Sequence, residues 1–184
     1  SAAILARFLR ERQILARLEH PNIARLLDGG VAADGRPYLV LERVEGEPIH
    51  DWCRRHDIPI AERLRLLIAV CEAVETAHRC LVVHRDLKPS NILVDAHGRV
   101  KLLDFGLVRD AAADSAYRTQ AFGGTAAYMA PEQGAGAAPA ESCDWYSMGV
   151  VLYEALTGQV PFDGAFLETL WAKRQTPARP PAEL

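Results

Sequence analysis

The chain contains very little lysine. Of its 21 basic residues only Lys88, Lys101 and Lys173 are lysines, and the first 87 residues contain none. Its four cysteines form no Cys-x-x-Cys pair and have no histidine at metal-ligand spacing, which argues against a disulfide framework and a zinc site. The formal net charge of -3 lacks the basic excess that binding to a nucleic-acid backbone requires. No apolar run approaches the roughly 20 residues that span a bilayer. We therefore expect a cytoplasmic segment with no nucleic-acid partner and no membrane contact of its own, and leave open a membrane tether elsewhere in the full-length protein.

Length and patterning indicate one globular unit of mixed helices and strands. The chain has 184 residues, of which 49% are hydrophobic and 24% charged. Apolar residues at helical spacing predict helices over 2–18 and 62–79, and a stretch that is apolar on nearly every side predicts a buried central helix over 145–156. Residues 107–140 are rich in Ala, Gly, Ser and Thr and predict a long loop of the length that usually carries function.

Short apolar runs between turn-rich stretches predict the strands. An antiparallel pair is expected from 23–27 and 38–44, a hairpin from 91–94 and 100–103, and a further short strand at 82–83. The chain is expected to be extended from residue 176 onward.

Two motifs carry chemistry. Residues 84–91 read His-Arg-Asp-Leu-Lys-Pro-Ser-Asn, and residues 104–106 read Asp-Phe-Gly. A carboxylate, an ammonium and an amide on one loop, with a second carboxylate after the hairpin, are the groups that phosphoryl transfer from Mg-ATP requires. Either motif alone could arise by chance, whereas the two together are a much stronger signal.

The two motifs resemble the catalytic loop and the metal-binding turn of eukaryotic-like serine/threonine protein kinases of the bacterial type. Gly124-Thr125, Ala130-Pro131-Glu132 and Asp144-Trp145 follow in the order expected for that family. The resemblance implies an α+β, protein-kinase-like fold of two lobes. It implies one partial kinase domain over 1–184, with an incomplete N-terminal lobe at 1–43 and a mainly helical C-terminal lobe at 44–184.

The resemblance also implies a role for each catalytic residue. Asp86 would accept the proton of the substrate hydroxyl, and Lys88 would stabilise charge on the moving phosphoryl group. Thr125 would bond to both. Asn91 and Asp104 would hold Mg²⁺, with Mn²⁺ as an alternative ion.

ATP is the expected phosphoryl donor. By resemblance, Leu41 would gate the adenine pocket and the backbone groups of Glu42 and Val44 would bond to adenine. An ordinary edge strand would explain the same apolar alternation. Leu93, Lys88 and Asp104 complete the set of residues expected to contact the nucleotide.

Several residues are expected to regulate the site or to hold it together. Glu11 resembles the glutamate that pairs with the ATP-binding lysine, and this role is preferred over the alternative of a solvated charge on a helix face. Arg85 implies a loop that is ordered by phosphorylation, with Thr119 as the preferred hydroxyl and Ser115 as the second choice. Phe105 and His84, with Leu15 and Leu26, match an apolar column between the lobes, which ordinary core packing explains as well. Of the structural residues, Glu132 would normally pair with an arginine, and Asp144 would hold the catalytic-loop backbone.

The chain departs from the family pattern at both ends. No glycine-rich strand and no lysine precede Glu11, and the later helices with the arginine partner of Glu132 are missing. We interpret the chain as a fragment of a longer kinase and expect little or no activity from it alone.

The predicted function is ATP-dependent phosphorylation of serine or threonine hydroxyls on proteins. The alternative is a kinase-like binding module without catalysis (a pseudokinase). A small-molecule phosphotransferase is disfavoured by Lys88, Thr125 and the Ala-Pro-Glu segment. The expected partners are ATP and a protein substrate, and self-association for autophosphorylation is left open.

Overall fold

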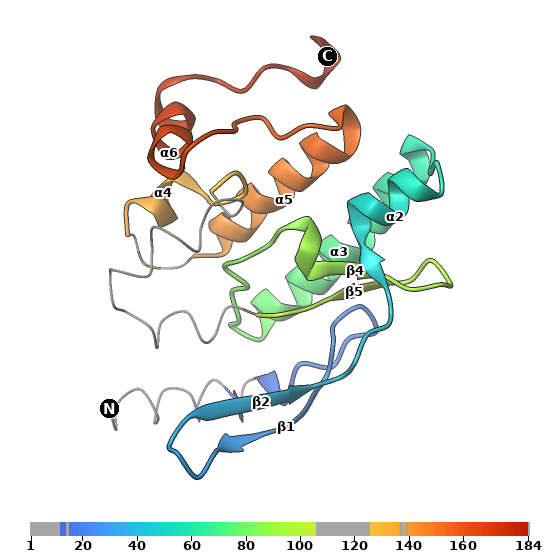
Figure 1. The fold of residues 1–184 in the computed structure, drawn as a ribbon, viewed down its shortest axis with the longest axis vertical. Coiled ribbons are helices and arrows are strands. Elements are labelled where there is room, and N and C mark those ends of the chain that lie inside the picture. The colour runs from blue at the N-terminus through green and yellow to red at the C-terminus, as the bar shows by residue number, and fades with distance from the viewer. Residues whose placement is uncertain (1–11, 14, 106–125, 137, 139, 184) are drawn as a thin grey trace.

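The computed structural model describes residues 12–13, 15–105, 126–136, 138 and 140–183. A small two-stranded sheet lies at one end of the molecule and a larger, mainly helical part at the other (Figure 1). The α+β class predicted from the sequence is confirmed. Predicted features within 1–11 and 106–125 lie outside the described residues. They comprise most of the helix over 2–18 and the positions of Glu11, Ser115, Thr119 and Thr125.

The small sheet pairs β1 (Leu26–Val31) with β2 (Pro37–Leu41) in antiparallel register, from Leu26 opposite Leu41 to Val31 opposite Pro37. Gly35 has a φ of 83° in the connecting turn, a conformation that glycine adopts without strain. The predicted pairing is therefore confirmed.

The predicted start of that first strand is wrong. Ile23 forms an isolated parallel bridge with Leu102 instead of joining β1. The N–H of Ala24 donates to the carbonyl of Leu102 at 2.9 Å, and the N–H of Leu102 donates to the carbonyl of Asn22 at 2.8 Å. Residues 22–24 therefore join the chain leading into the small sheet to the larger part of the molecule.

The second sheet has the order β3-β4-β5 and is antiparallel throughout. Its strands are β3 (Glu47–Pro48), β4 (Ile92–Val94) and β5 (Val100–Leu102). The predicted hairpin of β4 and β5 is confirmed, and Pro89–Asn91 forms a short 3-10 helix before it. The predicted strand at 82–83 is wrong, because the N–H of Val82 donates to the carbonyl of Ala77 and so closes the end of a helix.

Two long helices, α3 (Ile60–Arg79) and α5 (Glu141–Thr157), pack against each other and confirm the two helices predicted there. The structure adds α2 (Ile49–Arg55) and α6 (Phe166–Gln175), which the periodicity did not predict. It also places α4 (Pro131–Gly134) within the predicted long loop, and a 3-10 turn (Pro181–Glu183) near the end of the chain. No helix in the described part of the chain is both long and apolar enough to cross a membrane.

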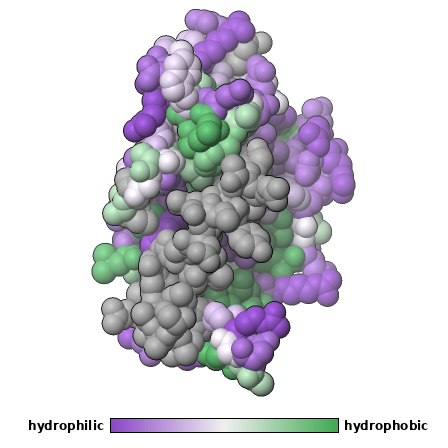
Figure 2. Space-filling model, turned by 60° about the vertical axis from the view of Figure 1, so that its left-hand side comes forward, coloured by the Kyte–Doolittle hydropathy of each residue, from purple (hydrophilic) through white to green (hydrophobic). Residues whose placement is uncertain are grey.

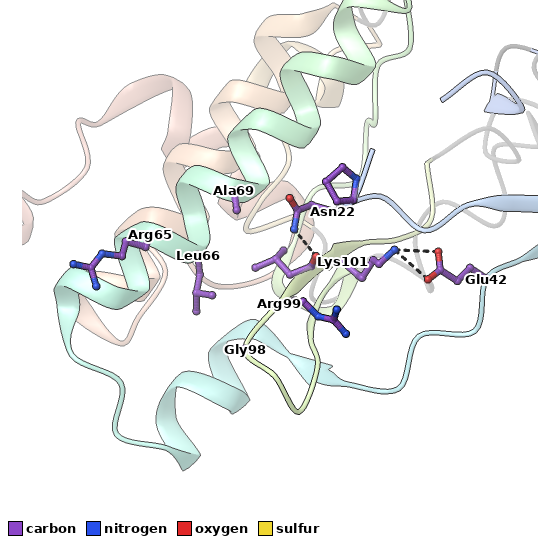
Figure 3. Close-up of a pocket in the computed structure, with 10 residues that line it drawn as sticks. Asn22, Glu42, Arg65, Leu66, Ala69, Gly98, Arg99 and Lys101 are labelled. Atoms are coloured by element: carbon purple, nitrogen blue, oxygen red, sulfur yellow. Dashed lines mark hydrogen bonds and ion pairs between the residues drawn. The ribbon is translucent and has the colours of Figure 1, made fainter. Parts of the chain in front are cut away.

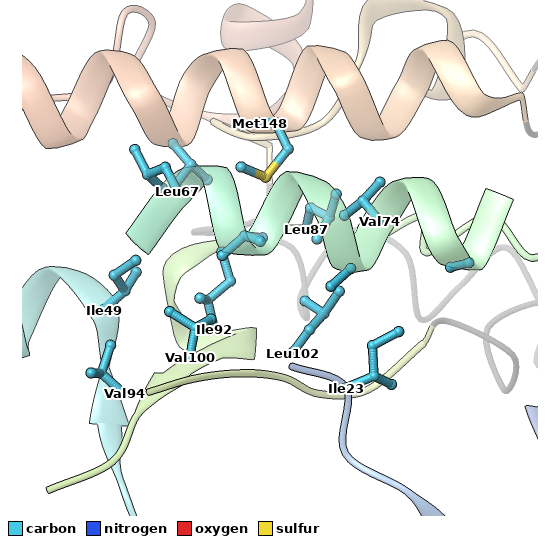
Figure 4. Close-up of a cluster of buried hydrophobic side chains, with 14 of the residues drawn as sticks. Ile23, Ile49, Leu67, Val74, Leu87, Ile92, Val94, Val100, Leu102 and Met148 are labelled. Atoms are coloured by element: carbon cyan, nitrogen blue, oxygen red, sulfur yellow. The ribbon is translucent and has the colours of Figure 1, made fainter. Parts of the chain in front are cut away.

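The core lies between α3, α5 and the second sheet (Figure 4). In β5 the side chains of Val100 and Leu102 are buried and Lys101 between them is only partly so, which is the two-residue alternation of a strand. Leu87, in the middle of the 84–91 loop, is 1% exposed and joins the same core. Burying such a side chain contributes about 1.5–3 kcal/mol. Leu87 therefore anchors the loop between Asp86 and Lys88.

On the face seen in Figure 2, hydrophilic residues and patches of hydrophobic residues both reach the surface. Two of the large apolar side chains with the greatest exposure lie four residues apart on α6, namely Leu167 and Trp171. Residues four apart share one face of a helix, so α6 exposes an apolar face.

Candidate active site

A buried carboxylate on α5 holds the start of the 84–91 loop. Asp144 is 1% exposed and accepts the backbone N–H of His84 at 2.7 Å and that of Arg85 at 2.8 Å. The His78 Nε2, from α3, lies 2.8 Å from the same carboxylate. Arg85 has a φ of 68°, a conformation that is rare for a non-glycine residue. Asp144 therefore fixes an unusual turn immediately before Asp86.

The imidazole of His84 connects this loop to the chain after β5. Its Nε2 lies 2.8 Å from the carbonyl oxygen of Leu103, which can only accept, so Nε2 carries the proton. The Nδ1 of the neutral ring then accepts the backbone N–H of Asp86 at 3.3 Å. Burial lowers the pKa of His84, which favours this neutral form. His84 thereby holds the backbone of Asp86 in place.

The residues predicted to form the apolar column lie as follows. The Phe105 ring packs against the His84 ring, with the two centroids 4.7 Å apart. Leu15 is buried in the core cluster, and Leu26 is partly buried against it. Ordinary core packing accounts for these contacts.

Asp86, Lys88 and Asn91 come together on the loop. The Lys88 ammonium lies 3.1 Å from Oδ2 of Asp86. The Asn91 side-chain amide donates to the Asp86 backbone carbonyl at 2.8 Å and to Asp86 Oδ2 at 3.3 Å. The Asp86 side chain is 11% exposed and that of Lys88 is 23% exposed. The loop therefore gathers a carboxylate, an ammonium and an amide at one place that solvent still reaches.

Asp104 follows β5 and is exposed. Its φ is 53°, which turns the chain sharply after Leu103. The N–H of Leu103 donates to the carbonyl of Asn91 at 2.9 Å. This bond ties the chain leading to Asp104 to Asn91, the last residue of the 84–91 loop. This bond brings the two predicted metal ligands onto adjacent segments.

The residues predicted to face the adenine ring lie at the end of β2 and beyond it. Leu41 and Val44 are partly buried, as is Leu93 in β4. The backbone N–H of Glu42 donates to the carbonyl of Arg25 at 2.8 Å, so the carbonyl is the backbone group of Glu42 left for adenine.

The side chain of Glu42 has a partner that the sequence did not suggest. Its Oε1 lies 3.0 Å from Nζ of Lys101 on β5, and both residues line a groove of about 540 Å³ (Figure 3). The backbone N–H of Arg25 and the Lys101 ammonium together lower the pKa of the Glu42 carboxyl. The groove is not lined by Asp86, Lys88, Asn91 or Asp104. The Glu42–Lys101 pair therefore joins the residue that follows β2 to β5.

Residues 128–133 lie beside the 84–91 loop. The Gln133 side-chain amide donates to the Arg85 carbonyl at 3.2 Å, and its Oε1 accepts the N–H of Ala130 at 3.0 Å. The Tyr128 hydroxyl donates to Glu154 of α5 at 2.5 Å. The contacts of Gln133 with Arg85 and of Tyr128 with Glu154 were not predicted, because these partners are 48 and 26 residues apart along the chain.

The carboxylate of Glu132 is partly buried. Its Oε1 lies 3.4 Å from Ser142 Oγ and 3.6 Å from Cys143 Sγ, both at the start of α5. Glu132 therefore contacts neutral donors on α5.

The fold is α+β, and it anchors Asp86, Lys88 and Asn91 on one loop beside a hairpin that is followed by Asp104-Phe105. This arrangement belongs to the class of protein-kinase-like folds. The family model described as "Protein kinase domain" matches residues 2–176, and the chain belongs to this family.

Proteins similar to this chain include bacterial serine/threonine-protein kinases. The chain is 42% identical over 164 residues to the serine/threonine-protein kinase PknB of Mycobacterium leprae, covering 86% of this chain and 26% of that protein. It is 41% identical over 165 residues to a probable serine/threonine-protein kinase of Corynebacterium efficiens, covering 86% and 25%. It is 35% identical over 187 residues to PrkC of Bacillus subtilis, covering 96% and 29%. The chain thus spans about a quarter of the length of the curated relatives it matches.

Proposed function

We propose that this chain carries the catalytic centre of a kinase that transfers the γ-phosphoryl group of ATP to serine or threonine hydroxyls of proteins. The observation that carries the proposal is the grouping of Asp86, Lys88 and Asn91 on a loop whose backbone Asp144 and His84 hold in place. The relatives named as serine/threonine-protein kinases support the same acceptor class.

In the proposed reaction the acceptor hydroxyl oxygen forms a bond to the γ-phosphorus while the bond from that phosphorus to the β,γ-bridging oxygen breaks. Asp86 takes the hydroxyl proton, and the bridging oxygen leaves with ADP. Lys88, next to Asp86, supplies positive charge to the transferred phosphoryl group. Thr125 is proposed to bond to both residues.

The donor set fits Mg²⁺, with Mn²⁺ as an alternative. The side-chain amide nitrogen of Asn91 is bonded to Asp86, which leaves the amide oxygen as the atom that would ligate the ion. Asp104 would add a carboxylate. Oxygen donors from one or two side chains, completed by substrate phosphates, are what this small, hard ion requires. When bound, the ion neutralises phosphate charge.

The nucleotide and regulatory roles are proposals from the sequence. Leu41, Val44 and Leu93, with the Glu42 carbonyl, are proposed to enclose adenine. Phosphorylation of Thr119 or Ser115 is proposed to order the loop through Arg85, and Glu11 to pair with an ATP-binding lysine. The lobe boundary at 43/44, the cytoplasmic location and self-association are further proposals of the same kind.

The test is transfer of labelled γ-phosphate by the natural protein to a protein acceptor, compared between wild type and Asp86→Asn. We expect Asp86→Asn to lower kcat by about 10²–10⁴ and to leave Mg-ATP binding nearly unchanged, because Asp86 positions and deprotonates the hydroxyl. Asp57→Asn is the matched control, since Asp57 is an exposed aspartate at a φ of 47°, which asparagine tolerates equally well.

The outcomes separate the alternatives. Equal turnover of Asp86→Asn and wild type would remove Asp86 from the reaction. A wild type that binds partners but transfers no phosphate would be a kinase-like binding module. Faster transfer to sugars or aminoglycosides than to proteins would indicate a small-molecule phosphotransferase.

A further inference from the structure

Two side chains donate hydrogen bonds to four consecutive backbone carbonyls near the 84–91 loop. The Lys173 ammonium on α6 donates to the backbone carbonyls of Ala126, Ala127 and Met129, each at 2.7 Å. Ser147 on α5 donates to the remaining carbonyl, that of Tyr128, at 2.8 Å. Residues 126–129 are therefore held by side chains from α5 and α6.

The position of Lys173 suits a cation that holds backbone rather than one that faces solvent. An ammonium has three N–H donors, and three carbonyls accept here. Its Nζ also lies 5.1 Å from the centre of the Tyr146 ring, within the range of a cation–π contact. Burial lowers the pKa of Lys173 to about 8, so the side chain is mostly charged at neutral pH. Lys173 is also the last of only three lysines in the chain.

A side-chain contact connects the segment that follows residues 126–129 to Arg85, the residue before Asp86. The Gln133 side chain accepts the N–H of Ala130 and donates to the carbonyl of Arg85, so it bridges the 126–130 segment and the backbone preceding Asp86. A second contact joins α4 to α6, because a Cβ on Gly134 would lie 2.6 Å from a methyl carbon of Leu170. Helix α6 therefore contacts the segment 126–134 at two points, through Lys173 and through Leu170.

We propose that Lys173 is a positioning residue for the protein acceptor, which fixes the 126–129 turn so that the acceptor hydroxyl is presented to Asp86. This proposal rests on the proposed kinase function. Without the ammonium, three carbonyls lose charge-assisted hydrogen bonds and the turn relaxes. A displacement of about 1 Å can lower a rate by about 10²-fold, because the reacting atoms must approach in a defined geometry.

The test measures four quantities on the natural protein: KM for a protein acceptor, the rate of phosphoryl transfer to that acceptor, KM for ATP, and hydrolysis of ATP without an acceptor. We expect Lys173→Met, which keeps the length of the side chain and removes its donors, to raise the acceptor KM by about tenfold or more. ATP hydrolysis and the KM for ATP should change less than twofold. Lys173→Arg, whose guanidinium also donates to carbonyls, should restore most of the acceptor binding.

Arg174→Met is the matched control, because Arg174 is the exposed neighbour on the same helix and carries the same charge. If Lys173→Met does not fold, Lys173→Gln retains two N–H donors and should give an intermediate acceptor KM. An unchanged acceptor KM in every folded variant would overturn the positioning role. So would an equal loss of ATP hydrolysis and acceptor transfer, which a merely structural role predicts. Failure of wild type to phosphorylate any protein would instead refute the proposed function.

Discussion

His84 holds Asp86 through an unprotonated nitrogen: its Nδ1 accepts the Asp86 backbone N–H at 3.3 Å, while Nε2 donates to the carbonyl of Leu103. Protonation of Nδ1 would convert this acceptor into a donor and break the bond. The geometry of the proposed base therefore depends on a neutral histidine that is 1% exposed.

This dependence predicts a loss of stability in mild acid. Burial lowers the pKa of His84 below its ordinary value of 6.5. Between the folded pKa and 6.5 the unfolded chain binds more protons than the folded chain, so the free energy of unfolding decreases as the pH falls through this window. Urea unfolding at about pH 7.5 and about pH 5.5 should show the decrease in wild type and a smaller one in His84→Gln, which cannot be protonated.

The control for this measurement is His97→Gln. His97 is exposed in the turn between β4 and β5, and its replacement should leave the pH dependence as in wild type. An identical pH dependence in wild type and His84→Gln would show that His84 does not carry the effect.

The Glu42–Lys101 pair predicts a small electrostatic coupling between the two sheets. Their side chains are 28% and 22% exposed and their charged atoms are 3.0 Å apart. Partly exposed pairs of this kind contribute up to about 1 kcal/mol, and salt weakens them. A double-mutant cycle with Glu42→Gln and Lys101→Met, followed by urea unfolding, should give a coupling of this size that decreases in about 1 M salt. A coupling near zero at low salt would mean that the contact does not join the sheets.

The sequence predicted those elements of the fold that have a clear apolar pattern along the helix or a recognisable turn between two strands. Helix α3 has apolar residues at helical spacing, the central part of α5 is apolar on nearly every side, and β4 and β5 flank a local turn. All three were found with small shifts of their ends. Helix α2 has seven residues and α6 has ten, with two exposed apolar side chains on α6, so their spacing gave no clear signal. The prediction of a strand at 82–83 was wrong because the buried residue Val82 bonds to the end of α3 and not to a neighbouring strand.

From residue spacing alone, the candidate site was predictable only as far as its residues lie close together in sequence; the contact of Asp144 with the 84–91 loop, across 60 residues, was expected only from the family resemblance. Asp86, Lys88 and Asn91 lie within six residues, and their contacts follow from one loop. Lys101 meets Glu42 across 59 residues, and Lys173 meets Ala126 across 47. No local pattern connects such residues, because tertiary packing alone brings them together.

The last prediction concerns Asp104. If Asp104 and Asn91 hold the ion, Asp104→Ala removes one of the two oxygen donors and weakens the Mg²⁺-dependent part of nucleotide binding. ATP affinity of the natural protein is measured by calorimetry with Mg²⁺ and with excess EDTA. In wild type the ion should tighten ATP binding, whereas in Asp104→Ala the two affinities should be close. Asp95→Ala is the control, because Asp95 lies in the turn between β4 and β5 and bonds to Arg99. Unchanged Mg²⁺ dependence in Asp104→Ala would exclude Asp104 from the metal site, since no other change in that variant would restore the missing ligand.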